Sequence, residues 1–508
     1  MGSSILSLLG TAAFRSRGWQ PCNVSSTVAT ILAVFALNYV ILFAYFDVVY
    51  PSFISPLRHI PRPKWWRARI IYRRFTKTQG EALSDLFYDT PNNGILAVRE
   101  LTTTRLLVTA PSLLADLLVH RSYDFTKAEN TRNFLREIWE TGSSSLRETN
   151  TSFSKALLCT DEIESAAGLH GGNPEITTDM ADWANKVTLD IIGIAGLGRD
   201  FNVLQNGHDQ IADDYEAIFE PSVEKILYIL LAAWFSFPMV RMLPWKMNDL
   251  FRSRTTSLRA TCKQLIESKM EGIRKQEQDN FDILSVLIQT DNFSVEEQSD
   301  QLLTFLAAGH DTTAPALTWS CYLLAVDQAR QETLRREIQA ALAGAQLGPD
   351  NADIGSILER LPFLNAVLNE TLRLYPSVPV TIRVAIRDTR LGEQYIPQGT
   401  EILVSPWVIN RSKHVWGASA ETFKPERWIE NGQSDKASSN YDFMTFLHGP
   451  RSCIGQNFAK AELRCLLAAM ALRFSWTLDM DEAEVVPAGA ITIKPAKGLR
   501  LRLKTVQN

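Results

Sequence analysis

Residues 446–455, FLHGPRSCIG, constrain the fold of this chain more than any other stretch. Phe446, Gly449, Arg451, Cys453 and Gly455 form the pattern FxxGxRxCxG, which chance would produce on the order of once in 10⁴ chains of this length. The glycines allow a tight loop that can approach a flat ligand. The apolar stretch that follows predicts a helix, whose N-terminus would favour a thiolate at Cys453. Arg451 supplies a fixed positive charge that suits a carboxylate.

The composition fits a large globular chain and excludes several classes of protein. The chain has 508 residues, of which 45% are hydrophobic and 21% charged, so it can bury a large core and a bulky cofactor. A formal net charge of -4 does not indicate a nucleic-acid partner. The six cysteines form no CxxC pair, which argues against a disulfide framework and a structural zinc site.

An uncharged apolar stretch of 19 residues, VATILAVFALNYVILFAYF at 28–46, predicts a membrane anchor. No small-residue cleavage site follows it, so we favour an uncleaved anchor over a signal peptide. The heavier basic flank follows the stretch, which predicts that the C-terminal part faces the cytosol. The resulting plan is a tail on the far side of the membrane (1–26), a transmembrane anchor (27–47), a Pro-containing basic hinge (48–63) and one large domain (64–508).

The large domain is predicted to be mainly α with small β regions. Helical periodicity recurs at 112–119, 182–197, 248–278, 281–287, 296–326, 328–341, 364–374 and 454–472. Strand patterns occur at 98–109, 379–387 and 401–409. The segment 141–178 is rich in Ser, Thr and Gly and is predicted to be a loop. The apolar run 226–240 is too short to span a membrane and predicts a core helix or a lid at the bilayer surface.

The spacing of two charged residues on an apolar helix predicts a buried ion pair. Glu370 and Arg373 form ExxR on one face of the apolar helix LNAVLNETLRLYP, where the two charges can pair. A second arginine, Arg427, lies in the sequence PERW. Such a cluster is costly unless it is well satisfied, and it fixes geometry more than it adds stability.

An acid and an alcohol, Asp311 and Thr312, interrupt the apolar helix FLAAGHDTTAPALTW. Packing does not explain this pair, although the Thr312 hydroxyl can also bond back to its own helix. Pro315 lacks the N–H that would bond the carbonyl of Asp311, so we expect a kinked or loosened helix there.

Together, these motifs resemble the cytochrome P450 family over the chain from about residue 28 to the end. The resemblance implies the P450 fold preceded by one N-terminal transmembrane helix, and a haem b whose iron is bound by Cys453. It implies that Asp311 and Thr312 deliver protons to dioxygen and that Glu370, Arg373 and Arg427 lock the cysteine loop. The residues that it places at the cofactor are Arg383, Arg451, Phe446, Gly449 and Gly455; candidate substrate contacts are Ala307, Ala308, Val378 and Val380.

The anchor, the basic hinge and the AGHDTT motif are similar to the microsomal, fungal-type branch. This similarity implies a mono-oxygenase that acts on an apolar small molecule, as in secondary-metabolite biosynthesis, with O2 and with electrons from NADPH–cytochrome P450 reductase. It implies contact with membrane lipid at the endoplasmic reticulum. Two alternatives are a reductase-independent isomerase or dehydratase, and a non-catalytic or impaired membrane-anchored haem protein. The intact Asp311-Thr312 pair argues against the isomerase.

One element that the resemblance implies is missing from the sequence. The family carries a helix with a Trp or His followed by an Arg, which together bind a haem propionate. Segment 141–178 contains no Trp-xxx-Arg, and Ser154 and Lys155 lie about where the basic residues belong. We therefore hypothesise that the chain binds haem more weakly than a family member that has this helix.

Overall fold

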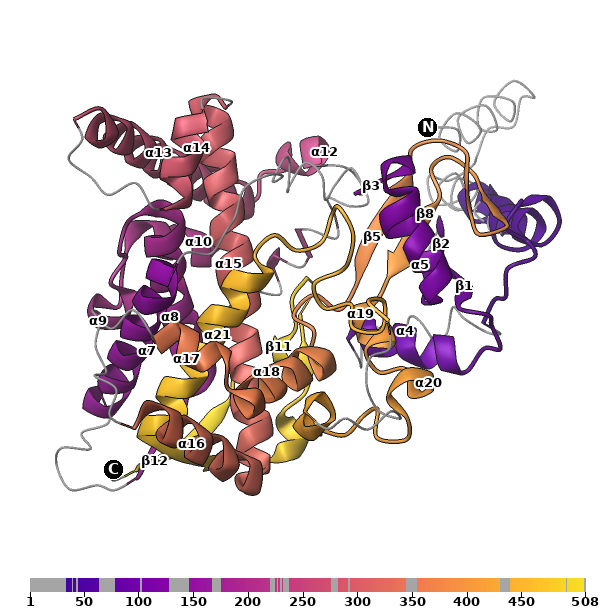
Figure 1. The fold of residues 1–508 in the computed structure, drawn as a ribbon. Helices are drawn as coiled ribbons and strands as arrows, with labels where there is room; N and C mark the ends of the chain where they lie inside the picture. The colour runs from indigo at the N-terminus through magenta and orange to yellow at the C-terminus, as the bar shows by residue number, and fades with distance from the viewer. Residues whose placement is uncertain are drawn as a thin grey trace.

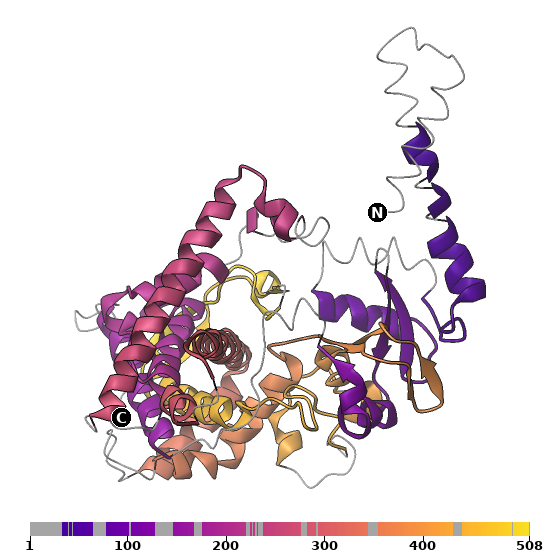
Figure 2. The same cartoon turned by 90° about the horizontal axis from the view of Figure 1, so that it is seen from above.

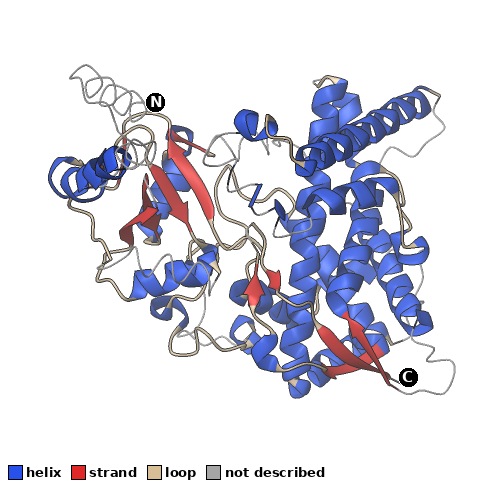
Figure 3. Cartoon of the chain, turned by 180° about the vertical axis from the view of Figure 1, so that it is seen from behind, coloured by secondary structure: helices blue, strands red, loops and turns tan. Residues whose placement is uncertain are grey.

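Helices dominate the structure, and the strands gather mainly on one side of the molecule (Figures 1 and 3). This architecture agrees with the predicted class, mainly α with small β regions. The computed structural model describes residues 33–38, 40–42, 44–63, 78–100, 103–127, 146–166, 175–219, 224–225, 227–228, 231, 237–275, 282–290, 293–343, 354–429, 439–489 and 491–506.

The helical region is built around α15 (Val295–Val326), which packs against α8 (Met180–Ile192) and α21 (Gln456–Arg473). Their apolar side chains form a large core cluster that includes the fully buried Trp319. The remaining α-helices with described bounds are α4 (Gln79–Tyr88), α5 (Pro111–Ala115), α9 (Val203–Asn206), α10 (Gln210–Phe219), α12 (Phe237–Arg241), α13 (Lys246–Arg274), α14 (Ile283–Thr290), α16 (Gln328–Leu342), α17 (Ile354–Glu359), α18 (Pro362–Leu374), α19 (Pro406–Ile409) and α20 (Lys413–Trp416).

The segment 141–178 is not a loop as predicted. It contains a helix of 21 residues, α7 (Leu146–Ala166), and the strand β4 (Glu175–Asp179). Phe153, Ala156 and Ile163 lie on one buried face of α7, which packs against α21. The abundant Ser and Thr residues hid this face, because they lower helix propensity without preventing the burial of its apolar positions.

Lys155 of α7 has a structural partner. Its ammonium nitrogen lies 2.7 Å from a carboxylate oxygen of Asp200 and 3.5 Å from one of Asp190. The Asp190 carboxylate also accepts hydrogen bonds from the backbone N–H groups of Val203 and Leu204. Lys155 therefore ties α7 to the segment that follows α8.

The largest sheet has five strands in the order β1-β2-β8-β5-β3. The paired strands predicted at 98–109 are confirmed as an antiparallel pair, β1 (Ile95–Glu100) and β2 (Thr103–Val108). β8 (Glu401–Val404) runs parallel to β2, and β5 (Thr381–Ala385) and β3 (Phe125–Thr126) follow in antiparallel pairing. The smaller sheets comprise β4, β12 (Arg500–Thr505) and β9 (Phe474–Leu478); β6 (Thr389–Leu391) and β7 (Gln394–Ile396); and β10 (Pro487–Ala488) and β11 (Lys494–Pro495).

The strand predicted at 401–409 is correct only for its first half. Pro406 occupies the first turn of the short helix α19, and the Ser405 hydroxyl accepts a hydrogen bond from the Val408 N–H at 3.3 Å. A proline at the start of a helix and a serine cap are standard helix-start signals. They end β8 and turn the chain away from the sheet.

The N-terminal part of the described chain lies beside the sheet, and its indigo helix projects outward in Figure 2. It includes the π-helix η1 (Tyr45–Ile54), and Leu57 and Ile60 then pack into the core beneath the sheet. The last part of the predicted hinge is therefore packed against the domain. The predicted span at 28–46 lies partly outside the described residues, and none of the described helices has the length and apolarity needed to cross a membrane, so the span stays a prediction.

Candidate functional site

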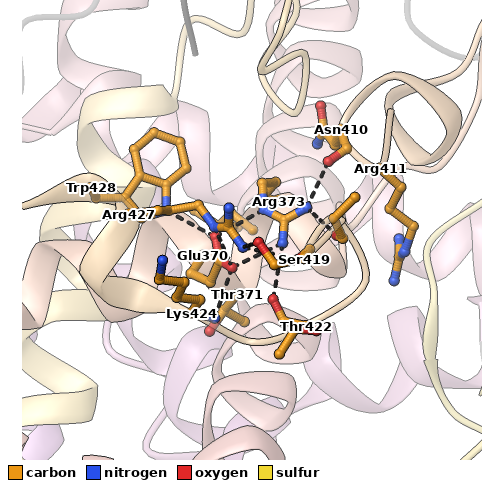
Figure 4. A network of polar contacts seen from close by, with 12 residues as sticks. Glu370, Thr371, Arg373, Asn410, Arg411, Ser419, Thr422, Lys424, Arg427 and Trp428 are labelled. Atoms are coloured by element: carbon orange, nitrogen blue, oxygen red, sulfur yellow. Dashed lines mark hydrogen bonds and ion pairs between the residues drawn. The ribbon is translucent and has the colours of Figure 1, made fainter. Parts of the chain in front are cut away.

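Figure 4 shows the predicted Glu370–Arg373 pair together with Arg427, which the family resemblance adds to it. The Glu370 carboxylate lies 2.8 Å from Nε of Arg373 and 3.0 Å from Nε of Arg427, and none of the three side chains is exposed to solvent. The Trp428 indole N–H and the Lys424 backbone N–H also donate to it, at 3.0 and 2.9 Å. Burial alone would raise the pKa of Glu370, but the two arginines hold it below its usual range.

Arg373 uses its remaining donors to fix the chain around it. Its guanidinium donates to the backbone carbonyls of Asn410, Ala420 and Thr422 at 2.8, 2.6 and 3.3 Å (Figure 4). These carbonyls belong to a stretch of short helices and turns with little regular structure to satisfy them. A buried backbone carbonyl needs a partner. One side chain thus holds the loop that leads toward the cysteine segment.

The cysteine loop has the tight geometry that its glycines predicted. The Cys453 backbone N–H donates to the Phe446 carbonyl at 2.8 Å, which closes the loop. Gly449 has a φ of +84°, in the region that favours glycine, and a Cβ there would lie 2.3 Å from the Leu118 carbonyl oxygen. Gly455 then caps α21, so the predicted helix follows the cysteine directly.

We expect Gly449→Ala to lower the free energy of unfolding by about 1–3 kcal/mol through backbone strain, with a further loss from the clash with Leu118. Gly207→Ala is the matched control, because Gly207 has a φ of +74° but no neighbour within 4 Å of the added Cβ. Urea unfolding of both variants measures the difference. Equal losses of unfolding free energy in the two variants would show that the close approach of Gly449 to Leu118 does not add to the cost of a side chain there.

Helix α15 is continuous through the acid–alcohol pair and through Pro315, so the loosening expected at Pro315 does not interrupt the helix. The Thr312 hydroxyl donates to the Ala308 carbonyl at 2.7 Å, which is the alternative that the sequence left open. Gly309 allows close packing, because a Cβ there would lie 2.6 Å from the Ile192 side chain on α8.

Asp311 is anchored by a residue that sequence reasoning missed. The Tyr215 hydroxyl on α10 donates to the Asp311 carboxylate at 2.6 Å, and the tyrosine is almost fully buried. The neighbouring His310 contacts α8, where its Nδ1 lies 2.9 Å from the Thr188 hydroxyl oxygen. No local pattern could have identified Tyr215, because 96 residues separate it from Asp311.

Contacts between neighbouring segments connect α15 to the cysteine loop. The Ser377 hydroxyl donates to the Thr312 carbonyl at 2.7 Å, and the chain then continues into β5 with Arg383. β5 pairs with β3, whose Phe125 carbonyl accepts a hydrogen bond from Arg451 of the cysteine loop. The residues that the sequence singled out therefore share one connected region.

Comparison with known proteins identifies the family to which this chain belongs. A family model described as Cytochrome P450 matches residues 126–500. The chain belongs to the cytochrome P450 family. It is 34% identical over 494 residues to cytochrome P450 monooxygenase ptmK of Penicillium ochrochloron, covering 90% of this chain and 96% of that protein. It is 35% identical over 517 residues to cytochrome P450 monooxygenase sphH of Aspergillus fumigatus, covering 95% and 94%.

As a P450 mono-oxygenase, the chain has a haem-thiolate iron cofactor. Cys453 is exposed, whereas the other described cysteines, Cys159, Cys262, Cys321 and Cys465, are buried. Burial of its sulfur nevertheless raises the pKa of Cys453, while the Gly455 N–H and the charge of Lys127 oppose that shift. Coordination by iron would hold the sulfur as a thiolate, as metals do with thiols. Cys453 remains the predicted ligand.

The basic residues near Cys453 fit a cofactor with carboxylates. Arg383 is almost fully buried, and its guanidinium donates to the Thr381 hydroxyl and the Ile382 carbonyl, both at 3.1 Å. Burial, reinforced by the neighbouring charge of Arg451, lowers the pKa of Arg383 to about 10. An anion bound between the two guanidinium groups would offset this repulsion. The two propionates of a haem would supply that charge.

The candidate substrate contacts lie next to these groups along the chain. Ala308 is exposed on α15, and Ala307 is half-buried. Val378 and Val380, also half-buried, follow Ser377, whose hydroxyl bonds to Thr312. All four remain predicted contacts. The run 226–240 lies largely outside the described residues, so its predicted role as a lid stays a prediction.

Proposed function

We propose that this P450 mono-oxygenase hydroxylates or otherwise oxidises an apolar small molecule in fungal secondary metabolism, with O2 and with electrons from NADPH–cytochrome P450 reductase. The haem, when bound, supplies the oxidising chemistry. The observation that carries the proposal is the Asp311-Thr312 pair on α15. The Tyr215 hydroxyl donates to the Asp311 carboxylate at 2.6 Å, and the Ser377 hydroxyl donates to the Thr312 carbonyl at 2.7 Å.

In this proposal, Asp311 holds a proton and releases it into the site, and the Thr312 hydroxyl relays it. The Tyr215 hydroxyl orients the Asp311 carboxylate by donating to one of its oxygens, which leaves the other oxygen for proton transfer. The Thr312 hydroxyl donates to the Ala308 carbonyl, so the lone pairs of its oxygen can accept a hydrogen bond from a proton donor. Ala307, Ala308, Val378 and Val380 would favour an apolar substrate over water.

We expect Asp311→Asn to slow reductase-driven turnover about a hundredfold, because an amide oxygen can accept the same hydrogen bond from Tyr215 but the amide cannot hold and release a proton. Product formation and NADPH consumption, each with and without the reductase, measure the effect. Asp327→Asn is a control outside the site, since Asp327 caps α16 and pairs with Arg330. Full turnover without NADPH and reductase would overturn the mono-oxygenase assignment.

We also propose that residues 28–46 anchor the protein in the endoplasmic reticulum membrane with the catalytic domain facing the cytosol. The proposal is supported by the uncharged apolar stretch and by the basic residues that follow it. An anchor of this kind would keep the domain at the lipid surface, where both an apolar substrate and a membrane-bound reductase are found.

A further inference from the structure

We propose that Lys127 is a third cation for the haem propionates, beside Arg383 and Arg451, and that it serves in place of the Trp/His–Arg pair that segment 141–178 lacks. The inference rests on the proposed function, since it needs a haem in the site. Sequence reasoning did not single out Lys127, because only the pairing of two distant strands brings it to this place.

Strand pairing brings Lys127 near Arg383. In the antiparallel pair β3–β5, Phe125 faces Ala385 and Thr126 faces Val384. Lys127 directly follows the last paired residue of β3, and Arg383 directly precedes the partner of that residue on β5. The two cations therefore lie at the same end of the β3–β5 pairing.

Arg451 approaches this pairing from the cysteine loop. Its guanidinium donates to the carbonyl of Phe125, two positions before Lys127. The charge of Cys453 also acts to raise the pKa of Lys127, and Lys127 in turn acts to lower the pKa of Cys453. Lysine is suited to this role because its ammonium group acts as a flexible point charge toward carboxylates.

The three cations are uncompensated within the described chain. Arg383 and Arg451 have hydrogen bonds to neutral oxygens, and no described acidic side chain forms an ion pair with either of them or with Lys127. Burial and the charges of Arg383 and Arg451 lower the pKa of Lys127. Like charges held close together repel one another. Two carboxylates bound between them would reverse the sign of that interaction.

This reversal gives the proposal a distinctive test. Lys127→Gln removes a repulsion from the haem-free protein but an attraction from the haem-bound protein. We expect haem transfer from the holoprotein to an acceptor protein to become about tenfold faster or more, the effect of losing one charge-assisted contact. The haem-free form should melt at the same temperature or higher. A purely structural role would lower the melting temperature of both forms.

Three comparisons sharpen the test. Lys127→Arg keeps the charge and should retain haem as the wild type does. Lys497→Gln makes the same chemical change at an exposed lysine that pairs with Glu484, and should have no effect. With haem dimethyl ester, whose propionates carry no charge, wild type and Lys127→Gln should lose the cofactor at similar rates.

The outcomes separate this inference from the proposed function. Equal rates of haem loss for the wild type and Lys127→Gln would overturn the role of Lys127 while leaving the P450 assignment intact. A faster loss that persists unchanged with the dimethyl ester would also overturn it, because the effect would not involve the propionates. A wild-type protein that retains no haem and shows no thiolate signature would instead refute the proposed function.

Discussion

Cys453→Ser should abolish the thiolate signature in the reduced, carbon monoxide-bound spectrum and with it all reductase-driven oxidation. A serine hydroxyl is a poor replacement, because the thiolate donates electron density to the iron and favours cleavage of the O–O bond. The effect should be complete, since every other described cysteine is buried whereas Cys453 is exposed.

Cys262→Ala is the matched control for this variant. It removes a fully buried thiol from α13. The spectrum should not change, and the free energy of unfolding should fall only slightly. Spectra recorded at equal protein concentration, together with haem content, make the comparison. A thiolate signature that survives in Cys453→Ser would show that another cysteine binds the iron.

Glu370→Ala should cost about 3–5 kcal/mol of unfolding free energy. The substitution removes the carboxylate that pairs with both Arg373 and Arg427 and leaves two guanidinium groups buried beside each other. Natural domains have a total stability of about 5–15 kcal/mol, so much of the variant should fail to fold. Urea unfolding followed by circular dichroism, and soluble yield at low temperature, measure the loss.

Glu332→Ala provides the surface counterpart. Glu332 also pairs with two arginines, Arg335 and Arg336, but 43% of its side chain is exposed. We expect a cost of about 1 kcal/mol or less, because water screens such pairs. If the two variants lost equal stability, burial of the Glu370 cluster would not be what makes it costly to break.

The sequence predicted the parts of the site whose residues lie within one short segment. The cysteine loop needed its glycines at fixed spacing, and ExxR needed two charges on one helix face, so both could be recognised locally. The pairing of Arg427 with Glu370 was inferred from family resemblance, and the structure bears out the contact at 3.0 Å. These patterns are readable because each has a geometric requirement that few residue types meet.

The features that the sequence did not predict depend on tertiary packing. Tyr215 reaches Asp311 only because α10 packs close to α15, and Lys127 comes near Arg383 only because β3 pairs with β5. Helix α7 was mistaken for a loop because its buried face is diluted by Ser and Thr, whose effect on helix propensity is overridden by packing on α21.

The hydrogen bonds from Arg373 to backbone carbonyls also bear on the order in which the chain assembles. They join residues 37 to 49 positions apart, and the stretch that they hold precedes the cysteine loop in the chain. Contacts over such separations form slowly, because the entropy of loop closure is lost before the contact is gained. We therefore expect α18 to dock first, the stretch at 410–422 to close around its guanidinium, and the cysteine loop to settle last.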